Sequence, residues 1–318
     1  MPPPVPSGKP DADDPSDLML DVAPGERIWG HVLGQGADGN ELHYVRRGQG
    51  PPVLLLHGWP GFWYDWRRLI GGLSAAVDVL APDFRGFGDS PLPRGPAEQT
   101  SGEGPLAEDL ARLLDDLGVR GSVVVGFDVG AAVAQRLARR RPDLVAALVL
   151  LNPTHPGIGA RRDEVALRGE FWYQQLHQFP WAADLIARDR QSIEVYLRHF
   201  YEHWSYRPGA LRPYEFDRIV DVYARPGRFE ASIAWYRARP RDRRAAAVAD
   251  PARLLVDQPA EVLWSDRDPV APAGWADGIE EFLPNARVTP VPDAAHFIAW
   301  EDPRAVAQAV HRVLDRVG

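Results

Sequence analysis

The segment Val123-Val-Val-Gly-Phe-Asp-Val-Gly-Ala-Ala132 decides the fold, because it carries an apolar strand through a tight turn into a helix. Asp128 stands at the centre of the turn, between Gly126 and Gly130. Such a turn holds its central residue in a strained conformation with its neighbours pressed close, where larger side chains would clash. The sequence therefore predicts an α/β fold in which the Asp128 side chain projects at the N-terminus of a helix.

The chemistry of this turn depends on Asp128, because most chains with this geometry carry a serine there. A carboxylate needs no base to act as a nucleophile at pH 7. It attacks an sp³ carbon and leaves an alkyl ester, which water must then hydrolyse. The simpler interpretation is that Asp128 caps the helix, a common role for aspartate. The preceding strand and the paired glycines favour the nucleophile.

Short apolar runs alternate with helical stretches along the chain, which is typical of parallel strands joined by helices. We expect an eight-stranded, mostly parallel sheet covered on both faces. The predicted strands are 27–33, 41–46, 52–56, 77–81, 122–127, 146–151, 261–264 and 287–291. Helices are predicted near 64–74, 105–117, 130–140, 273–283 and 302–316.

Composition and net charge exclude or disfavour several classes of function. Hydrophobic residues make up 45% of the 318 residues, so the chain can pack a core. The net charge of −8 disfavours binding to nucleic acid or anionic membranes. The chain has no cysteine, which excludes disulfides and thiolate chemistry. Its longest apolar run, about 144–151, is far shorter than the roughly 18 residues that cross a bilayer, so we expect a cytoplasmic protein.

Three parts are predicted along the chain. Residues 1–20, rich in proline and aspartate, are expected to form a disordered tail. Residues 21–152 and 252–318 form the core with the strands. The interval 153–251 lacks clear strand runs and is predicted to be a helical cap over the edge of the sheet where such folds bind ligands. Its arginine-rich run 237–244 could hold an anion, but a solvated return to the core is favoured.

Two further segments supply candidate partners for Asp128. The turn that ends Leu54-Leu-Leu-His-Gly-Trp-Pro-Gly61 can bring the Trp59 N–H close to the nucleophile. With the Val129 N–H it would stabilise the oxyanion that forms when water attacks the ester. A turn of no chemical use is the alternative for this segment.

A histidine and an acid complete the pattern. His296 lies in the loop after the last predicted strand, where a general base would lie, and Asp268 follows the preceding strand and could orient the imidazole. The order Asp128, Asp268, His296 is the nucleophile, acid, histidine order of α/β-hydrolases. The alternatives are a surface histidine and an ordinary turn residue.

The chain resembles the epoxide hydrolase family of the α/β-hydrolase superfamily over roughly residues 25–315. The resemblance rests on matching order and spacing of His57–Pro60, Asp83–Ser90, Gly126–Gly130, Asp268 and His296. In addition, 170–178 and 231–238 resemble the cap segments from which that family presents two tyrosines to the epoxide oxygen. These tyrosines map onto Tyr173 and Tyr236.

The resemblance implies an α/β-hydrolase fold with a helical cap inserted after strand 6, and a reaction that uses no metal or organic cofactor. Asp128 would attack an epoxide carbon while Tyr173 and Tyr236 hold the oxygen. His296, oriented by Asp268, would activate the water that releases a vicinal diol. Opening an epoxide develops an alkoxide, which two phenols can hydrogen-bond and protonate.

Aromatic residues near these motifs indicate an apolar or aromatic epoxide as substrate. Besides Trp59, the predicted pocket residues are Phe62, Trp63, Phe171, Trp172 and Trp235. The chain departs from the family at Phe127 and Val129, where His and Trp are frequent, and we expect this departure to reshape the pocket floor.

Two other functions remain open. One is a haloalkane or haloacid dehalogenase that uses the same aspartate, although Val129 offers no indole for a halide, and Val129, Ala131 and Ala132 place no arginine beside the nucleophile for a carboxylate. The other is a non-catalytic small-molecule binding protein. The expected partners are a small epoxide and water, with no nucleic acid and no membrane, and the state as monomer or homodimer is left open.

Overall fold

A computed structural model describes residues 29–33, 41–207 and 209–318 and contains one eight-stranded sheet. The strand order is β1-β2-β4-β3-β5-β6-β7-β8, and β2 runs antiparallel to both of its neighbours while the remaining pairs are parallel. The strands are β1 (Trp29–Leu33), β2 (Glu41–Arg47), β3 (Pro52–Leu56), β4 (Asp78–Pro82), β5 (Ser122–Phe127), β6 (Val145–Leu151), β7 (Ala260–Ser265) and β8 (Ala286–Val291). The predicted mostly parallel α/β fold is confirmed.

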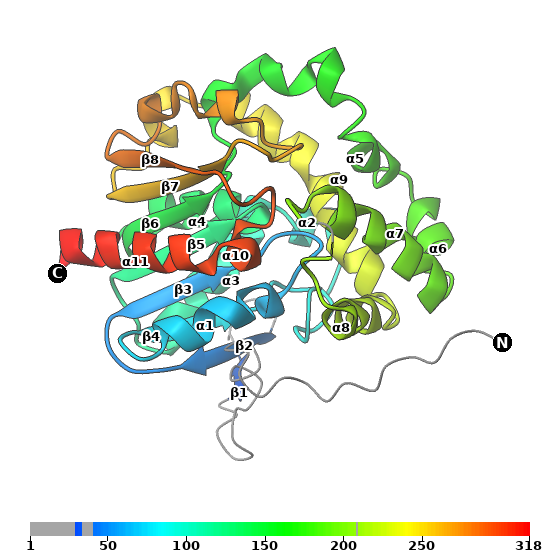
Figure 1. The fold of residues 1–318 in the computed structure, drawn as a ribbon, viewed down its shortest axis with the longest axis horizontal. Coiled ribbons are helices and arrows are strands. Elements are labelled where there is room, and N and C mark those ends of the chain that lie inside the picture. Colours follow the sequence, from blue (N-terminus) through cyan, green and yellow to red (C-terminus); the bar gives the residue numbers. More distant parts are fainter. Residues whose placement is uncertain (1–28, 34–40, 208) are drawn as a thin grey trace.

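Helices cover both faces of the sheet, with α1 and α11 in front of it and α3 and α4 behind it in Figure 1. The central strands β3, β4 and β5 are buried along nearly their whole length, which explains their continuous Val and Leu runs. These helices are α1 (Arg67–Leu73), α3 (Glu103–Asp116), α4 (Val129–Arg140) and α11 (Pro303–Val317), and two short helices are α2 (Ala97–Thr100) and α10 (Ile298–Glu301).

Between β6 and β7 the described residues form helices joined by loops and turns and no strand, and Figure 1 shows these helices together beyond one end of the sheet. They are α5 (Trp172–Leu176), α6 (Trp181–Ile186), α7 (Arg190–His203), α8 (Pro213–Tyr223) and α9 (Arg228–Ala247). The arginine-rich run 237–244 lies within α9 rather than in a solvated return. The boundaries 153 and 251 of a separate cap stay a prediction.

Two predicted helices differ from the structure. The stretch 64–74 begins as a 3₁₀ turn, Trp63–Trp66, before α1. The stretch 273–283 holds two short 3₁₀ turns, Ala273–Ala276 and Ile279–Glu281, because Pro272 and a left-handed Gly278 (φ 75°) interrupt it. The predicted tail 1–20 lies outside the described residues. Among the described helices, none has the length and apolar character needed to cross a membrane.

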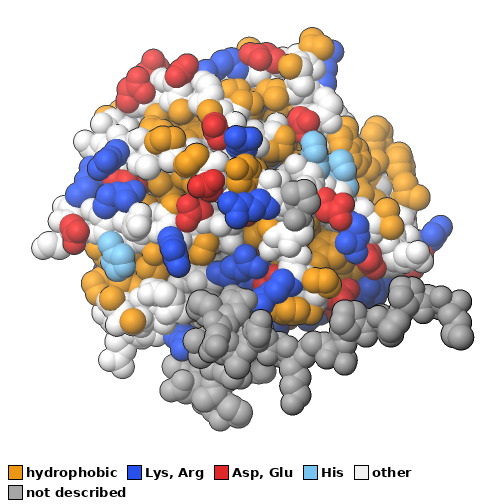
Figure 2. Space-filling model, viewed as in Figure 1, with side chains coloured by type: hydrophobic (Ala, Val, Ile, Leu, Met, Phe, Trp, Pro, Cys, Tyr) orange, Lys and Arg blue, Asp and Glu red, His pale blue; other side chains and the backbone are white. Residues whose placement is uncertain are grey.

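Buried charge joins the core to the segment between β6 and β7. Glu215 of α8 accepts hydrogen bonds from Arg67 at 2.7 Å and from Arg68 at 3.1 Å, and both arginines belong to α1. The Glu215 side chain is almost inaccessible to solvent. On the outer surface, by contrast, acidic and basic side chains are interspersed over the face shown in Figure 2.

Candidate active site

The turn between β5 and α4 holds Asp128 in a left-handed conformation (φ 50°, ψ −113°) that non-glycine residues rarely adopt. Glycines permit the turn. A Cβ on Gly130 would lie 2.1 Å from the Leu56 carbonyl oxygen of β3, and a Cβ on Gly126 would lie 2.6 Å from the Gly130 carbonyl oxygen. The Gly-x-Asp-x-Gly pattern thus reflects close backbone packing on both sides of the aspartate.

The turn after β3 approaches Asp128 from the side. The Trp59 N–H donates a hydrogen bond of 2.9 Å to Oδ1 of Asp128. The preceding Gly58 is required here, because a Cβ would lie 2.6 Å from the Asp128 Cβ. Val129 opens α4 and lines the cavity above Asp128, but among the described contacts its N–H makes no hydrogen bond to the resting carboxylate.

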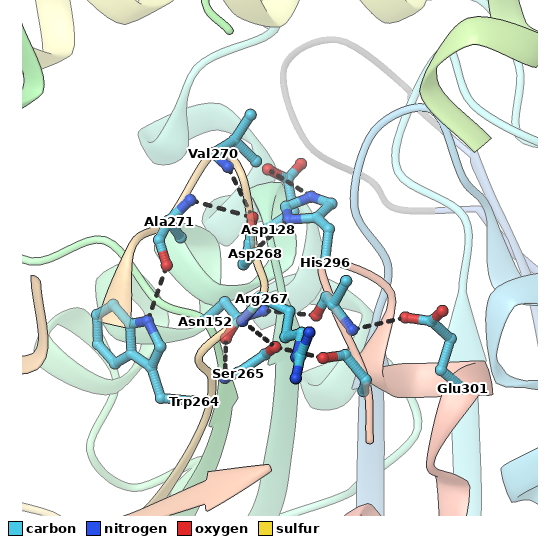
Figure 3. A network of polar contacts seen from close by, with 12 residues as sticks. Asp128, Asn152, Trp264, Ser265, Arg267, Asp268, Val270, Ala271, His296 and Glu301 are labelled. Atoms are coloured by element: carbon cyan, nitrogen blue, oxygen red, sulfur yellow. Dashed lines mark hydrogen bonds and ion pairs between the residues drawn. The ribbon is translucent and has the colours of Figure 1, made fainter. Parts of the chain in front are cut away.

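The loop after β8 brings His296 to the same carboxylate, as Figure 3 shows. Nε2 of His296 lies 3.8 Å from Oδ2 of Asp128. The other ring nitrogen, Nδ1, is hydrogen-bonded to Oδ2 of Asp268 at 2.7 Å. Oδ1 of Asp268 accepts the N–H groups of Val270 and Ala271 at 2.8 and 3.0 Å. The N–H groups of its own turn therefore hold the Asp268 carboxylate in place, and this carboxylate orients the His296 imidazole.

Buried polar groups anchor the histidine loop to the sheet. Asn152, at the end of β6, accepts the Ser265 N–H at 2.8 Å and donates to the Ala295 carbonyl at 3.2 Å. The Ala295 N–H donates to Glu301 of α10 at 2.9 Å. The hydroxyl of Ser265 donates to the Ala294 carbonyl. The residues just before His296 are thus held from both sides (Figure 3).

The pKa of His296 reflects two opposing effects. Burial lowers the pKa of the imidazole, but the charge of Asp268, the hydrogen bond to it and the charge of Asp128 more than offset burial, so the pKa lies above its ordinary value. His57, by contrast, hydrogen-bonds Gly58 through Nδ1 and accepts the Phe84 N–H at Nε2, and burial lowers its pKa. That histidine supports the turn and has no free ring nitrogen.

Tyr173 of α5 and Tyr236 of α9 line the cavity together with Asp128 and His296. Their ring centroids are 5.3 Å apart at 86°, and both pack on the Trp59 indole, at 5.5 and 5.4 Å. Burial first, and then the charge of Asp128, raises the pKa of Tyr173. Burial, Tyr173 and Asp128 raise the pKa of Tyr236. Both phenols therefore stay protonated and can donate hydrogen bonds.

Comparison with known proteins agrees with this arrangement. Residues 51–303 match the family described as alpha/beta hydrolase fold. A soluble epoxide hydrolase of Corynebacterium sp. (strain C12) is 34% identical over 205 residues, which cover 63% of this chain and 69% of that protein. The solved structure of the epoxide hydrolase CorEH, at 26% identity, superposes with a TM-score of 0.77 and covers 92% of this chain and all of that one.

The chain belongs to the epoxide hydrolase family of the α/β-hydrolase superfamily. Epoxide hydrolase 4 of Homo sapiens is also similar, with 26% identity over 317 residues that cover 95% of this chain and 82% of that protein. The predicted family resemblance is confirmed.

Only some of the predicted pocket residues lie at the cavity of this epoxide hydrolase. Phe171 and Trp235 line it. Phe62 is instead buried in the core, where it stacks on Tyr64, and Trp63 contacts the same tyrosine edge-on. Trp172 is 40% exposed and stacks on Phe200, and unlike its neighbour Tyr173 it does not line the cavity. The structure does not place these three side chains at the cavity, and their part in substrate binding stays a prediction.

Several polar residues that line the cavity of this epoxide hydrolase were not predicted as site residues from the sequence. Gln174 donates to the Tyr173 hydroxyl at 3.1 Å and could have been inferred from its place beside that tyrosine. No motif marks Asn152, Thr154 or Arg162, whereas Arg239 belongs to the arginine-rich run 237–244, for which an anion site was the less favoured prediction. They come from the strand end, the 3₁₀ turn Pro156–Asp163 and α9, and meet only in the folded chain.

One group of potential metal ligands occurs in the described part of this epoxide hydrolase, formed by His43, Asp83 and Asp89. Asp83 accepts hydrogen bonds from the Trp63 and Asp89 N–H groups at 2.7 and 2.8 Å and contacts Nδ1 of His43 at 2.7 Å. Asp89 pairs with Arg225. These residues thus satisfy one another and stabilise the turn after β4, and none of them lines the catalytic cavity.

Proposed function

We propose that this epoxide hydrolase converts an apolar or aromatic epoxide to a vicinal diol through an ester on Asp128. The single observation that carries this proposal is the shared cavity of Asp128, Tyr173, Tyr236 and His296. A carboxylate faces two phenols that stay protonated, and an imidazole oriented by Asp268 lies beside it. Phe171 and Trp235 in the same cavity favour an apolar body for the substrate.

In the first half-reaction, Oδ2 of Asp128 attacks an epoxide carbon and the ring C–O bond breaks. Oδ1 is already engaged by the Trp59 N–H, so Oδ2 is the oxygen free to attack. The departing oxygen accepts hydrogen bonds from Tyr173 and Tyr236 and takes a proton from one of them. The product of this step is an alkyl ester of Asp128.

In the second half-reaction, His296 takes a proton from water and the hydroxide attacks Cγ of Asp128. The oxyanion forms at Oδ1, where Trp59 donates its N–H and Val129 is the proposed second donor. Collapse of this intermediate breaks the ester C–O bond and regenerates the carboxylate. The two water protons end on the second product hydroxyl and on the phenolate, so every group returns to its initial state.

Formation of the ester on Asp128 lowers the pKa of His296, the base for the second half-reaction. In the free enzyme the charge of Asp128 raises the pKa of His296. An ester is neutral and removes that contribution, so the pKa of the imidazole falls when the ester forms. His296 is then more readily neutral, which is the state that accepts a proton.

A single-turnover reaction in oxygen-18 water with excess enzyme tests the ester route. We expect the label in the Asp128 carboxylate, detected by mass analysis of its peptide, and not in the first-turnover diol. Asp128→Ala should show neither label nor diol. Label found only in the diol would establish direct attack by water, and release of halide without diol formation from an epoxide and haloalkane panel would indicate a dehalogenase.

Three predictions stay predictions: location in the cytoplasm, a homodimer, and the roles of the individual site residues.

The variant His296→Gln gives the clearest check on the role of one site residue. We expect the ester on Asp128 to form and then to accumulate, because no base remains to activate water. Unchanged steady-state turnover in this variant would remove His296 from the mechanism.

A further inference from the structure

An arginine that forms no ion pair with a described carboxylate lines the catalytic cavity. Arg162 lines this cavity together with Asp128 and Tyr173, and it also lines the two pockets beside it. Its Nε is buried and makes no hydrogen bond to any described part of the chain. A buried guanidinium normally has a carboxylate or several carbonyl partners, because an unpaired charge is costly to bury.

Two aromatic rings lie against this guanidinium. Its carbon lies 5.3 Å from the Phe171 ring centroid and 5.6 Å from that of Trp275, and the two rings are stacked on each other. Such contacts use the π-faces of the rings and leave the N–H groups of the guanidinium available. The planar fork of a guanidinium is suited to bind a carboxylate through two parallel hydrogen bonds.

Neighbouring charges make an anion favourable at this place. Burial first, and then the positive charges of Arg243 and Arg239, lower the pKa of Arg162 to about 9. Arg239 already pairs with Glu103, and the charge of Asp163 acts on Arg243. The charge of Asp128 acts on Arg162, but among the described residues no carboxylate forms an ion pair with its guanidinium, so a substrate anion would compensate its charge.

We propose that Arg162 is a specificity-determining residue that binds a carboxylate on the substrate, so that the preferred epoxides carry a carboxylate on an aromatic or apolar body. Phe171 and Trp235 contact that body, and the epoxide ring lies at Asp128 and the two phenols. This inference rests on the proposed function and adds a substrate class to it.

A matched pair of substrates tests the assignment. The acid 4-(oxiran-2-ylmethoxy)benzoate and its methyl ester present the same epoxide with and without a charge. We expect kcat/KM of the wild-type enzyme to favour the acid, and Arg162→Met to reduce the acid-to-ester ratio about 10- to 100-fold, mainly through KM of the acid. Because the ratio compares two substrates of one enzyme sample, partial loss of folded protein does not change it.

Two variants control the experiment. Arg162→Lys keeps a positive charge without the planar pair of donors, so we expect it to keep part of the preference. Arg188→Met removes an arginine that is 72% exposed and outside the cavity, and should leave the ratio unchanged. Benzoate should inhibit the wild-type enzyme more strongly than benzamide, and this difference should disappear in Arg162→Met.

Equal kcat/KM for acid and ester in the wild type, or a ratio that Arg162→Met does not alter, would overturn the carboxylate subsite while leaving the ester mechanism in place. Failure of the mechanism is seen separately, as absence of oxygen-18 from Asp128 with either substrate.

Discussion

Nε2 of His296 lies 3.8 Å from Oδ2 of Asp128, beyond the distance of a hydrogen bond. The imidazole therefore does not hold the nucleophilic oxygen, in contrast to the serine hydrolases, where histidine must first deprotonate the nucleophile. In the proposed mechanism the carboxylate is ready to attack without a base, and the histidine is needed only for the second half-reaction. This separation predicts different pH dependences for the two steps.

We expect hydrolysis of the Asp128 ester to slow as the pH falls, because protonated His296 cannot accept a proton from water. The apparent pKa of this step should lie below the imidazole pKa of the free enzyme, since the ester removes the Asp128 charge that raises the latter. Single-turnover rates from pH 5 to 9 and an NMR titration of the free enzyme measure the two values. An apparent pKa for hydrolysis above that of the free imidazole would contradict the assignment.

Loss of either phenol should slow ring opening rather than ester hydrolysis. We expect Tyr173→Phe and Tyr236→Phe each to reduce the rate of alkylation, and the double variant to reduce it by about 10²- to 10⁴-fold, the range typical of general acids. Rapid-quench measurement of the ester gives the alkylation rate directly. Tyr44→Phe, at a buried tyrosine on β2, is the matched control and should react like the wild type.

Gly130→Ala should damage both stability and catalysis, because its Cβ would overlap the Leu56 carbonyl oxygen and displace the turn at Asp128. Overpacking of this kind costs about 1–3 kcal/mol. Gly72→Ala is the control, because no atom lies within 4 Å of its Cβ and it belongs to α1. That change should stabilise the fold by about 0.5–1 kcal/mol. Urea unfolding and kcat of both variants decide the point.

Glu215→Gln should destabilise the enzyme by about 3–5 kcal/mol, because Arg67 then remains buried without its anion. Glu194→Gln, which breaks exposed pairs with Arg190 and Arg198 on α7, should cost under about 1 kcal/mol. Denaturant unfolding at pH 7 compares the two. Equal losses of unfolding free energy in the two variants would show that the buried ion pair stabilises the fold no more than the exposed pairs do.

The Glu215 contribution should also depend on pH. Burial raises the pKa of this carboxyl, but Arg67, the Arg212 N–H and Arg68 together lower it more, so it lies below its ordinary value. A carboxyl of this kind stabilises the fold above its unfolded pKa, and the stabilisation is lost as the pH falls through the folded value. The difference between wild type and Glu215→Gln should therefore shrink in acid.

The sheet could be predicted because its strands are buried on both faces and appear as continuous apolar runs, as at 52–56 and 122–127. Asp128, Asp268 and His296 could be predicted as site candidates because each follows a strand in a short loop with its own signature. The interval between β6 and β7 has neither property. Which face of a short helix meets the cavity depends on packing, so Phe171 could not be told apart from Trp172.

Arg162 illustrates the same limit. It lies in a 3₁₀ turn with no recognisable motif, beside Arg161, which binds backbone carbonyls instead. Folding brings Arg162 into contact with Phe171, which belongs to a different turn, and with Trp275, which follows β7 in the sequence. Sequence spacing carries no information about such a meeting.

Trp59 connects the sheet with the helices between β6 and β7, because its N–H binds the Asp128 carboxylate and its indole packs against both Tyr173 and Tyr236. In the proposed mechanism this single ring would keep both proton donors aligned with the attacking oxygen even where the outer sequence of those helices changes. Transplanting residues 153–251 from a relative should accordingly redirect substrate choice without rebuilding the chemistry, provided that the graft retains two rings shaped to sit on that indole.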